Sequence, residues 1–340
     1  MLALPIVGRT GSGLLLMAAA ALLYAAGRAA VYALARPDGA DPGRRAIAQC
    51  LPITAAVLAA IVMNRPEIAV AVIFGTSVAC LSLVLGLATY VAPLDNLPPS
   101  RRMWPFILPA ALLPLMAGFS GHLSWWHALM LLGLGGAVLG VWLQTPDAPA
   151  MPGEDRPPAR LAGLVLLGAV LLAIPGAVLA VNGVISSSRQ TQTLSSGTLA
   201  ATILSPLLVL PTLGTSSLVA QRGRAGEALS ALVGTVLINL CAVLPVAVIL
   251  WYAVSMHGAD HSATASAGAS AFHNPFAGLA GLPYAMATWR IETVMLVVLG
   301  FALTPVAMGR WTVGRLESAL LVLGYIVYLG AAAIFGTQLL

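Results

Sequence analysis

Apolar stretches long enough to cross a lipid bilayer follow one another along almost the whole chain. A membrane-spanning α-helix needs about 20 mainly apolar residues. Such stretches lie at residues 12–35, 46–63, 67–93, 103–119, 124–143, 161–184, 198–220, 227–254, 284–309 and 315–337. They are apolar throughout, whereas the strands of a membrane β-barrel alternate apolar and polar residues. The sequence therefore predicts an all-α integral membrane protein with ten transmembrane helices.

The composition excludes most soluble protein classes. Apolar residues make up 59% of the 340 residues and charged residues only 8%, against about 25% charged residues in a soluble domain. The sequence contains no phosphate-binding loop, dinucleotide fingerprint, zinc-protease motif or nucleophile elbow. All three cysteines lie in apolar stretches, which gives no indication of a disulfide framework. We therefore predict a protein that is not an enzyme and that has no cofactor or metal centre.

The arginines predict how the chain crosses the membrane. All 16 basic residues are arginines, and eleven of them lie in the loops after the odd-numbered stretches. The N-terminal segment and the loops on the other side contain three. Because short cytoplasmic loops are enriched in basic residues, we expect both termini on the periplasmic or extracellular side of the cell inner membrane. Arginines in short loops report topology, so we predict no nucleic-acid partner.

A polar, Pro-rich linker at 144–160 divides the chain into two halves, 1–143 and 161–340. We expect this linker in the cytoplasm. Each half contains five apolar stretches. Because five is an odd number, the two halves must enter the membrane in opposite orientations.

The two halves share a spaced pair of motifs. Each has a Leu-Pro pair inside its second stretch, and Gly-Thr begins 23 residues after the proline. The matched pairs are Leu51-Pro52 with Leu210-Pro211, and Gly75-Thr76 with Gly234-Thr235. Matching motifs in oppositely inserted halves predict two inverted five-helix repeats.

The two mid-helix prolines mark a candidate site. Proline removes one helix hydrogen bond, and backbone groups freed at membrane depth must be satisfied by protein or by a water-lined cavity. We therefore predict helix breaks at Pro52 and Pro211, next to a transport site near the midplane. The alternative is that both are ordinary kinks in packed helices.

At these motifs the chain resembles the calcium/cation antiporter superfamily, which includes the sodium/calcium exchangers. The segments at 65–94, 226–246 and 312–330 look like the third, eighth and tenth helices of that family. The resemblance implies ten helices in two inverted repeats and cation antiport by alternating access. It also implies a site formed by helices 2 and 7 together with helices 3 and 8.

The chain departs from the family pattern at the positions where the family has its charged motif residues. The family has a glutamate after each Leu-Pro, but this chain has Ile53 and Thr212 there. Of the asparagines in the later motif only Asn239 is retained. Ca²⁺ takes 6–8 oxygen ligands, usually including carboxylates. The transported ion is therefore not expected to use the family's carboxylate site, and its identity stays open.

Polar and motif-position residues near the predicted site are the candidates for ion binding. They are Gln49, Cys50, Ile53, Thr54, Thr76, Ser77, Cys80, Thr212, Thr215, Thr235 and Asn239. Hydroxyls, amides and freed carbonyls suit a monovalent ion or a neutral polar solute. The alternative for each polar group is an ordinary hydrogen bond between helices, and the thiols are either soft-metal ligands or small apolar fillers.

We thus predict a secondary transporter, a cation antiporter whose partners are the lipid bilayer and a small inorganic cation. The alternative is a transport-inactive structural or regulatory subunit with the same fold. All acidic residues fall in loops or near helix ends, so no proton carrier is expected at the midplane. Arg290 and Glu292, at the outer start of the ninth stretch, are expected to be interfacial. The loop at 256–283, rich in Ser, Ala and His, has no assigned role.

Overall fold

The computed structural model describes residues 4–34, 42–93, 99–143, 159–191, 194–260, 281–284, 289–308 and 310–338. Of the predicted linker at 144–160, residues 144–158 lie outside the described residues. Most of the loop at 256–283 lies outside them as well.

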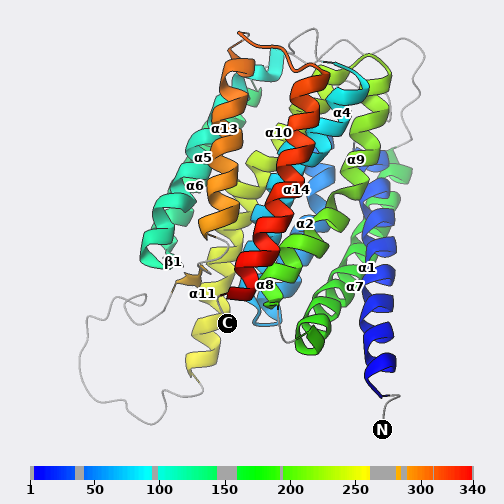
Figure 1. The fold of residues 1–340 in the computed structure, drawn as a ribbon, viewed down its shortest axis with the longest axis vertical. Helices are drawn as coiled ribbons and strands as arrows, with labels where there is room; N and C mark the ends of the chain where they lie inside the picture. Colours follow the sequence, from blue (N-terminus) through cyan, green and yellow to red (C-terminus); the bar gives the residue numbers. More distant parts are fainter. Residues whose placement is uncertain are drawn as a thin grey trace.

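Helices dominate both halves of the chain (Figure 1). The first half contains α1 (Leu4–Leu34), α2 (Pro42–Val62), α3 (Pro66–Ala79), α4 (Leu85–Val91), α5 (Ile107–Ala117) and α6 (Trp125–Leu143). The second half contains α7 (Ala159–Thr191), α8 (Ser196–Leu199), α9 (Ser205–Gln221), α10 (Ala225–Ile238), α11 (Leu244–Asp260), α13 (Val294–Ala307) and α14 (Arg315–Gln338).

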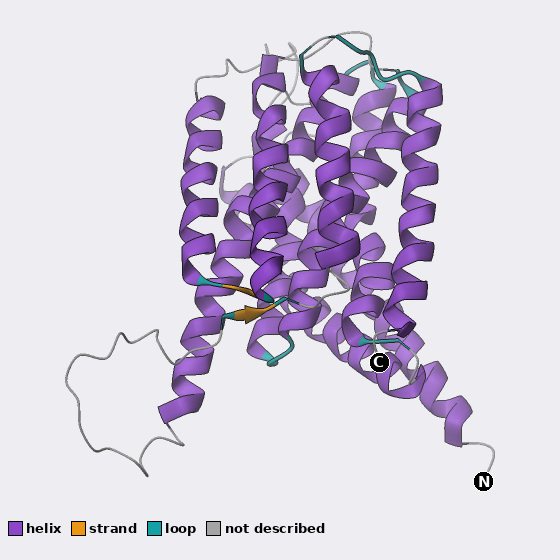
Figure 2. Ribbon diagram, turned by 60° about the vertical axis from the view of Figure 1, so that its left-hand side comes forward, coloured by secondary structure: helices purple, strands orange, loops and turns teal. Residues whose placement is uncertain are grey.

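Short irregular elements connect or extend these helices. The π-helical turns are η1 (Cys80–Val84), η4 (Ala200–Leu204), η5 (Asn239–Val243) and η7 (Trp289–Thr293). Two 3₁₀ segments, η2 (Pro99–Phe106) and η3 (Gly118–Ser120), flank α5. Strands β1 (His122–Leu123) and β2 (Leu282–Pro283) pair antiparallel at one end of the bundle, as Figure 2 shows.

Among the described residues, eight helical segments are long and apolar enough to cross a membrane, and Trp104–Ser120 is a shorter apolar helix. The predicted helical membrane protein is confirmed at this level, because each long apolar stretch forms helix. The count of ten spanning helices stays a prediction.

The predicted helix breaks at Pro52 and Pro211 are wrong. Both α2 and α9 run through their prolines as uninterrupted α-helices. A proline withdraws only one donor from the helix, and the turns on either side keep their own bonds. Both proline rings instead pack toward α1. A Cβ atom built on Gly27 would lie 2.8 Å from the Cβ of Pro211 and 3.6 Å from the Cγ of Pro52.

The irregular backbone lies in the π-helical turns instead. One extends α3 (η1), one extends α10 (η5), and one precedes α9 (η4). A π-turn shifts the hydrogen-bond ladder by one residue, and such turns are frequent at functional sites. Helices α3 and α10 begin at residues 66 and 225 and end at 79 and 238, so both bounds are 159 residues apart. Pro52 and Pro211 have the same separation.

Four helices form the centre of the bundle. Helix α2 contacts α3, α9 and α10, and α9 contacts α3 and α10. Every residue of α3 except Glu67 is buried. Helices α1 and α7 pack along each other on one flank, while α5, α6 and α13 lie on the other (Figure 1). Large apolar side chains of these outer helices are exposed, which suits contact with lipid.

Gly75 permits a close approach between the first and second halves. A Cβ atom there would lie 2.5 Å from Ser205 Oγ and 3.3 Å from the backbone Cα of Ala201. Because the backbone cannot yield as a side-chain tip can, we expect Gly75→Ala to destabilise the protein by about 1–3 kcal/mol. Gly136→Ala in α6 is the control, since a Cβ there meets nothing within 4 Å. Thermal unfolding in detergent measures both, and equal midpoints would contradict the prediction.

Candidate functional site

Gln49 of α2 joins three of the four central helices through its side-chain amide. Its Nε2 donates to Thr215 Oγ1 of α9 over 3.0 Å, and its Oε1 accepts from Thr235 Oγ1 of α10 over 2.9 Å. Gln49 is 1% exposed, and both threonines are buried. The threonine hydroxyls also lie 3.0 and 2.8 Å from carbonyl oxygens of their own helices, those of Pro211 and Ala231. This bridge therefore connects α2 of the first half to two helices of the second.

A second set of contacts brings in α3. Asn239, at the start of η5, donates from Nδ2 to Thr76 Oγ1 over 3.4 Å. The thiol of Cys50 donates to the backbone oxygen of Thr235 over 3.6 Å, and Cys50 lies within electrostatic range of Cys80 in η1. These contacts define what we call the central polar cluster. Its members are Gln49, Cys50, Thr76, Cys80, Thr215, Thr235 and Asn239.

Three buried oxygen atoms in or beside this cluster have no hydrogen bond to any described residue. They are Thr212 Oγ1, Ser216 Oγ and Asn239 Oδ1. Thr212 and Ser216 are four residues apart on α9, so they lie on one face of the helix, together with Thr215 of the cluster. An unpartnered buried oxygen loses its hydration without compensation. Thr212 and Ser216 lie in α9, and Asn239 begins η5 directly after α10, which packs against α9. Neutral oxygens of this kind are groups that a bound cation would satisfy.

The sequence-predicted candidates divide into two groups. Seven of them form the central polar cluster, and Thr212 is buried on α9 with its carbonyl accepting from Thr215. Ile53 is buried as part of the apolar core. Ser77 donates only to Ile73 of its own helix, and Thr54 is half-buried. Among the described residues neither of these two hydroxyls bonds to another helix.

Ser216 is also near the predicted site by its position in the repeat, and it belongs beside the candidate set. Its spacing of four residues from Thr212 puts both side chains on one face of α9. The central polar cluster carries no carboxylate, and no group of three or more His, Cys, Asp or Glu able to hold a metal occurs within the described part of the chain. The available ligands are neutral oxygens and thiols.

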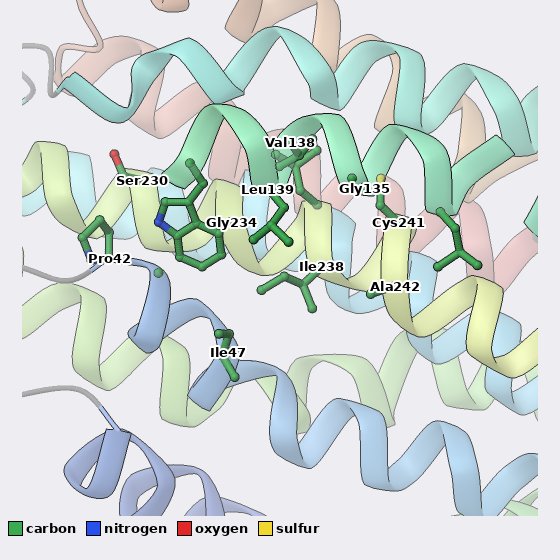
Figure 3. A pocket seen from close by; sticks show the side chains of 15 residues that line it. Pro42, Ile47, Gly135, Val138, Leu139, Ser230, Gly234, Ile238, Cys241 and Ala242 are labelled. Carbon is green, nitrogen blue, oxygen red and sulfur yellow. The ribbon is translucent and has the colours of Figure 1, made fainter. Parts of the chain in front are cut away.

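An apolar cavity of about 330 Å³ lies on the other side of α10 (Figure 3). Side chains of α2, α6, α10 and η5 line it, among them Ile47, Leu139 and Ile238. Its polar side-chain groups come from Ser230, Cys241 and the indole N–H of Trp142. Because a bare ion in such surroundings would lose its hydration without new ligands, this cavity is not the candidate ion site.

One comparison with known proteins identifies a family. The family model described as sodium/calcium exchanger protein matches residues 46–142 and 161–333, which is most of the chain. No curated protein matches the sequence.

Solved structures share the fold. The sodium-calcium exchanger NCX_Mj, soaked with 100 mM Na⁺ and 10 mM Sr²⁺, matches with a TM-score of 0.61 at 19% identity. That match covers 96% of this chain and 98% of the other. The H⁺/Ca²⁺ exchanger CAX matches with a TM-score of 0.68 at 15% identity, covering 98% of this chain and 86% of the other. At such identities the likeness concerns the fold.

Proposed function

Since this chain belongs to the sodium/calcium exchanger protein family, we propose that it is a secondary transporter, a cation antiporter of the inner membrane. Its relatives of known structure are exchangers of Na⁺, Ca²⁺ or H⁺ by their names. We place both termini on the periplasmic or extracellular side, as the distribution of arginines predicts.

We propose ten helices in two inverted five-helix repeats, with alternating access around α2 and α9 together with α3 and α10. Equivalent contacts in the two halves support this arrangement. Gly75 of α3 approaches Ser205, and Gly234 of α10 approaches Ala46, where an added Cβ would lie 2.5 and 3.0 Å from the neighbouring atom. Residues 75 and 234 are 159 apart, as are 46 and 205. Each half thus meets the other through the same pair of positions.

The ion that fits this site best is a monovalent cation. The observation that carries this proposal is the set of buried, unpartnered oxygens of Thr212, Ser216 and Asn239. They supply neutral ligands without a counter-charge. A divalent ion would keep two uncompensated charges in a low-dielectric interior, and Ca²⁺ normally takes carboxylates. A single positive charge costs much less there.

Flux in proteoliposomes tests the proposed function. We would impose Na⁺ and proton gradients in turn and follow Na⁺, K⁺, Ca²⁺ and pH. Gradient-driven movement of a monovalent cation, without Ca²⁺ movement, is expected. Ca²⁺ movement would overturn the proposed ion. A native protein that moves nothing under either gradient would overturn transport and favour the structural or regulatory subunit.

Thr212→Val removes an oxygen that has no hydrogen-bond partner among the described residues. Because the side-chain volume is kept and no hydrogen bond is lost, we expect stability to stay within about 0.5 kcal/mol or to rise. The concentration of Na⁺ that gives half-maximal flux should rise about tenfold, equivalent to about 1.4 kcal/mol of lost ion affinity.

Ser77→Ala is the matched control for Thr212→Val. It removes an equally buried hydroxyl that bonds only to its own helix, so its flux should follow the native protein. An unchanged Na⁺ dependence in Thr212→Val would mean that Thr212 is not a ligand.

A further inference from the structure

A buried carboxylate lies outside the central polar cluster. Glu292 of η7, which the sequence suggested to be interfacial, is 3% exposed and is therefore buried within the protein. Its Oε2 is buried and has no well-aligned hydrogen-bond partner among the described residues. The helix that begins here starts with a π-turn, and this turn packs against α3, α5 and α14. A side chain at a helix start is ordinarily exposed. Here the packed helices bury the Glu292 side chain.

Two tyrosines of α14 face this carboxylate. Tyr325 and Tyr328 are each 3% exposed, and their ring centroids are 5.6 Å apart. Both lie within electrostatic range of Glu292. Tyr328 faces the carboxylate directly, but its hydroxyl, like that of Tyr325, does not complete a hydrogen bond with good geometry. A carboxylate and two phenols thus share a buried space with unused hydrogen-bonding capacity.

Among the described residues, no compensating positive charge lies on the other sides of Glu292. Tyr284, which follows β2, lies within electrostatic range of Glu292 and bonds through its hydroxyl to Thr293. Its ring stacks on Phe74 of α3 at 5.6 Å. Helices α5 and α13 carry no titratable side chain, and the one in α3 is Glu67 in its first turn. Arg290 of the same π-turn is exposed.

These surroundings decide which ion Glu292 can bind. An ionised carboxylate buried without a counter-charge is costly, and binding a proton removes that cost. A metal ion needs several oxygen ligands, whereas one carboxylate and two phenols without a well-aligned hydrogen bond are present. A proton needs only the carboxylate, and the phenols can hydrogen-bond to it. We propose that Glu292 is a proton-binding site of this protein, with Tyr325 and Tyr328 as the groups that position its carboxyl.

Tyr325 lies between Glu292 and the central polar cluster. It is within electrostatic range of both Glu292 and Cys80, and its helix α14 packs against η1. Proton binding at Glu292 does not require that the protein transports an ion. It therefore goes beyond the proposed function, and its failure leaves that proposal intact.

Infrared spectroscopy of the whole protein tests the proton site directly. In a detergent without ester groups at neutral pH, exposed carboxyls are ionised, so a protonated carboxyl gives a separate C=O absorption. We expect the native protein to show this band, Glu292→Gln to lose it, and Glu317→Gln to keep it. Glu317 is the matched control because it lies exposed in the first turn of α14.

Tyr328→Phe keeps the test decisive if Glu292→Gln does not fold. Because the carboxyl remains but its neighbouring hydroxyl is lost, the band should persist at a shifted frequency. A native spectrum without the band at neutral pH would overturn the proposal. The same holds if the band is missing and addition of Na⁺ changes the carboxylate absorption, because Glu292 would then bind a metal ion and not a proton. A band that stays unchanged in Glu292→Gln, or in Tyr328→Phe, would overturn it as well.

Discussion

The double variant Ile53→Glu, Thr212→Glu is expected to bind Ca²⁺ and to be stabilised by it, whereas the native protein is not. Both positions follow a Leu-Pro pair in the central helices α2 and α9, and both side chains are fully buried. Two carboxylates there would supply the counter-charge that Ca²⁺ requires. At free Ca²⁺ of about 100 times the dissociation constant, binding adds about 2.7 kcal/mol to stability.

The same variant should be less stable than the native protein when Ca²⁺ is chelated, because two buried carboxylates then repel each other without compensation. Thermal unfolding with and without Ca²⁺ measures both effects. The control is Ile53→Gln, Thr212→Gln, which adds similar volume without charge and should not respond to Ca²⁺. An unfolding midpoint that ignores Ca²⁺ in the glutamate variant would show that the two positions do not share one site.

Gln49→Leu should strongly reduce transport and lower stability together. Gln49 donates to Thr215 and accepts from Thr235, so it holds α9 and α10 at a fixed position relative to α2. Leucine keeps most of the volume but makes neither bond. Because both threonine hydroxyls retain carbonyl acceptors in their own helices, we expect a stability loss of about 1–2 kcal/mol.

Flux should fall about a hundredfold in Gln49→Leu, since the ligand oxygens on α9 and η5 lose their common support. Gln49→Glu is the informative companion. It keeps the shape and can still accept from Thr235, but it loses the donor to Thr215. If Gln49→Leu transports like the native protein, the bridge is structural packing and the ion passes elsewhere.

Most of the architecture follows from local properties of the chain. The length of the apolar stretches is enough to predict the long helices. A continuous apolar segment inside a bilayer can satisfy its own backbone hydrogen bonds only as a helix. The repeat could also be predicted, since Leu-Pro and Gly-Thr recur at one spacing in both halves. The same 159-residue offset relates the bounds of α3 and α10.

The central polar cluster was predictable as a set but not as a network. Residues at matched motif positions could be assigned to one region. Their partners could not, because a hydrogen bond between Gln49 and Thr215 depends on how α2 and α9 cross. For the same reason Thr54 and Ser77 were predicted beside the others but make no bond to another helix within the described part of the chain.

The chain by itself therefore determined a helical membrane protein and the residues that carry the family resemblance, and it predicts two related halves. Tertiary structure alone decided where irregular backbone and buried charge lie. The helices continue through Pro52 and Pro211, and the π-turns fall elsewhere. Glu292 is near a helix start, where a carboxylate is ordinarily solvated, yet α14 covers it with Tyr325 and Tyr328. Hydropathy is a property of each segment, whereas burial of one side chain depends on which helix packs over it.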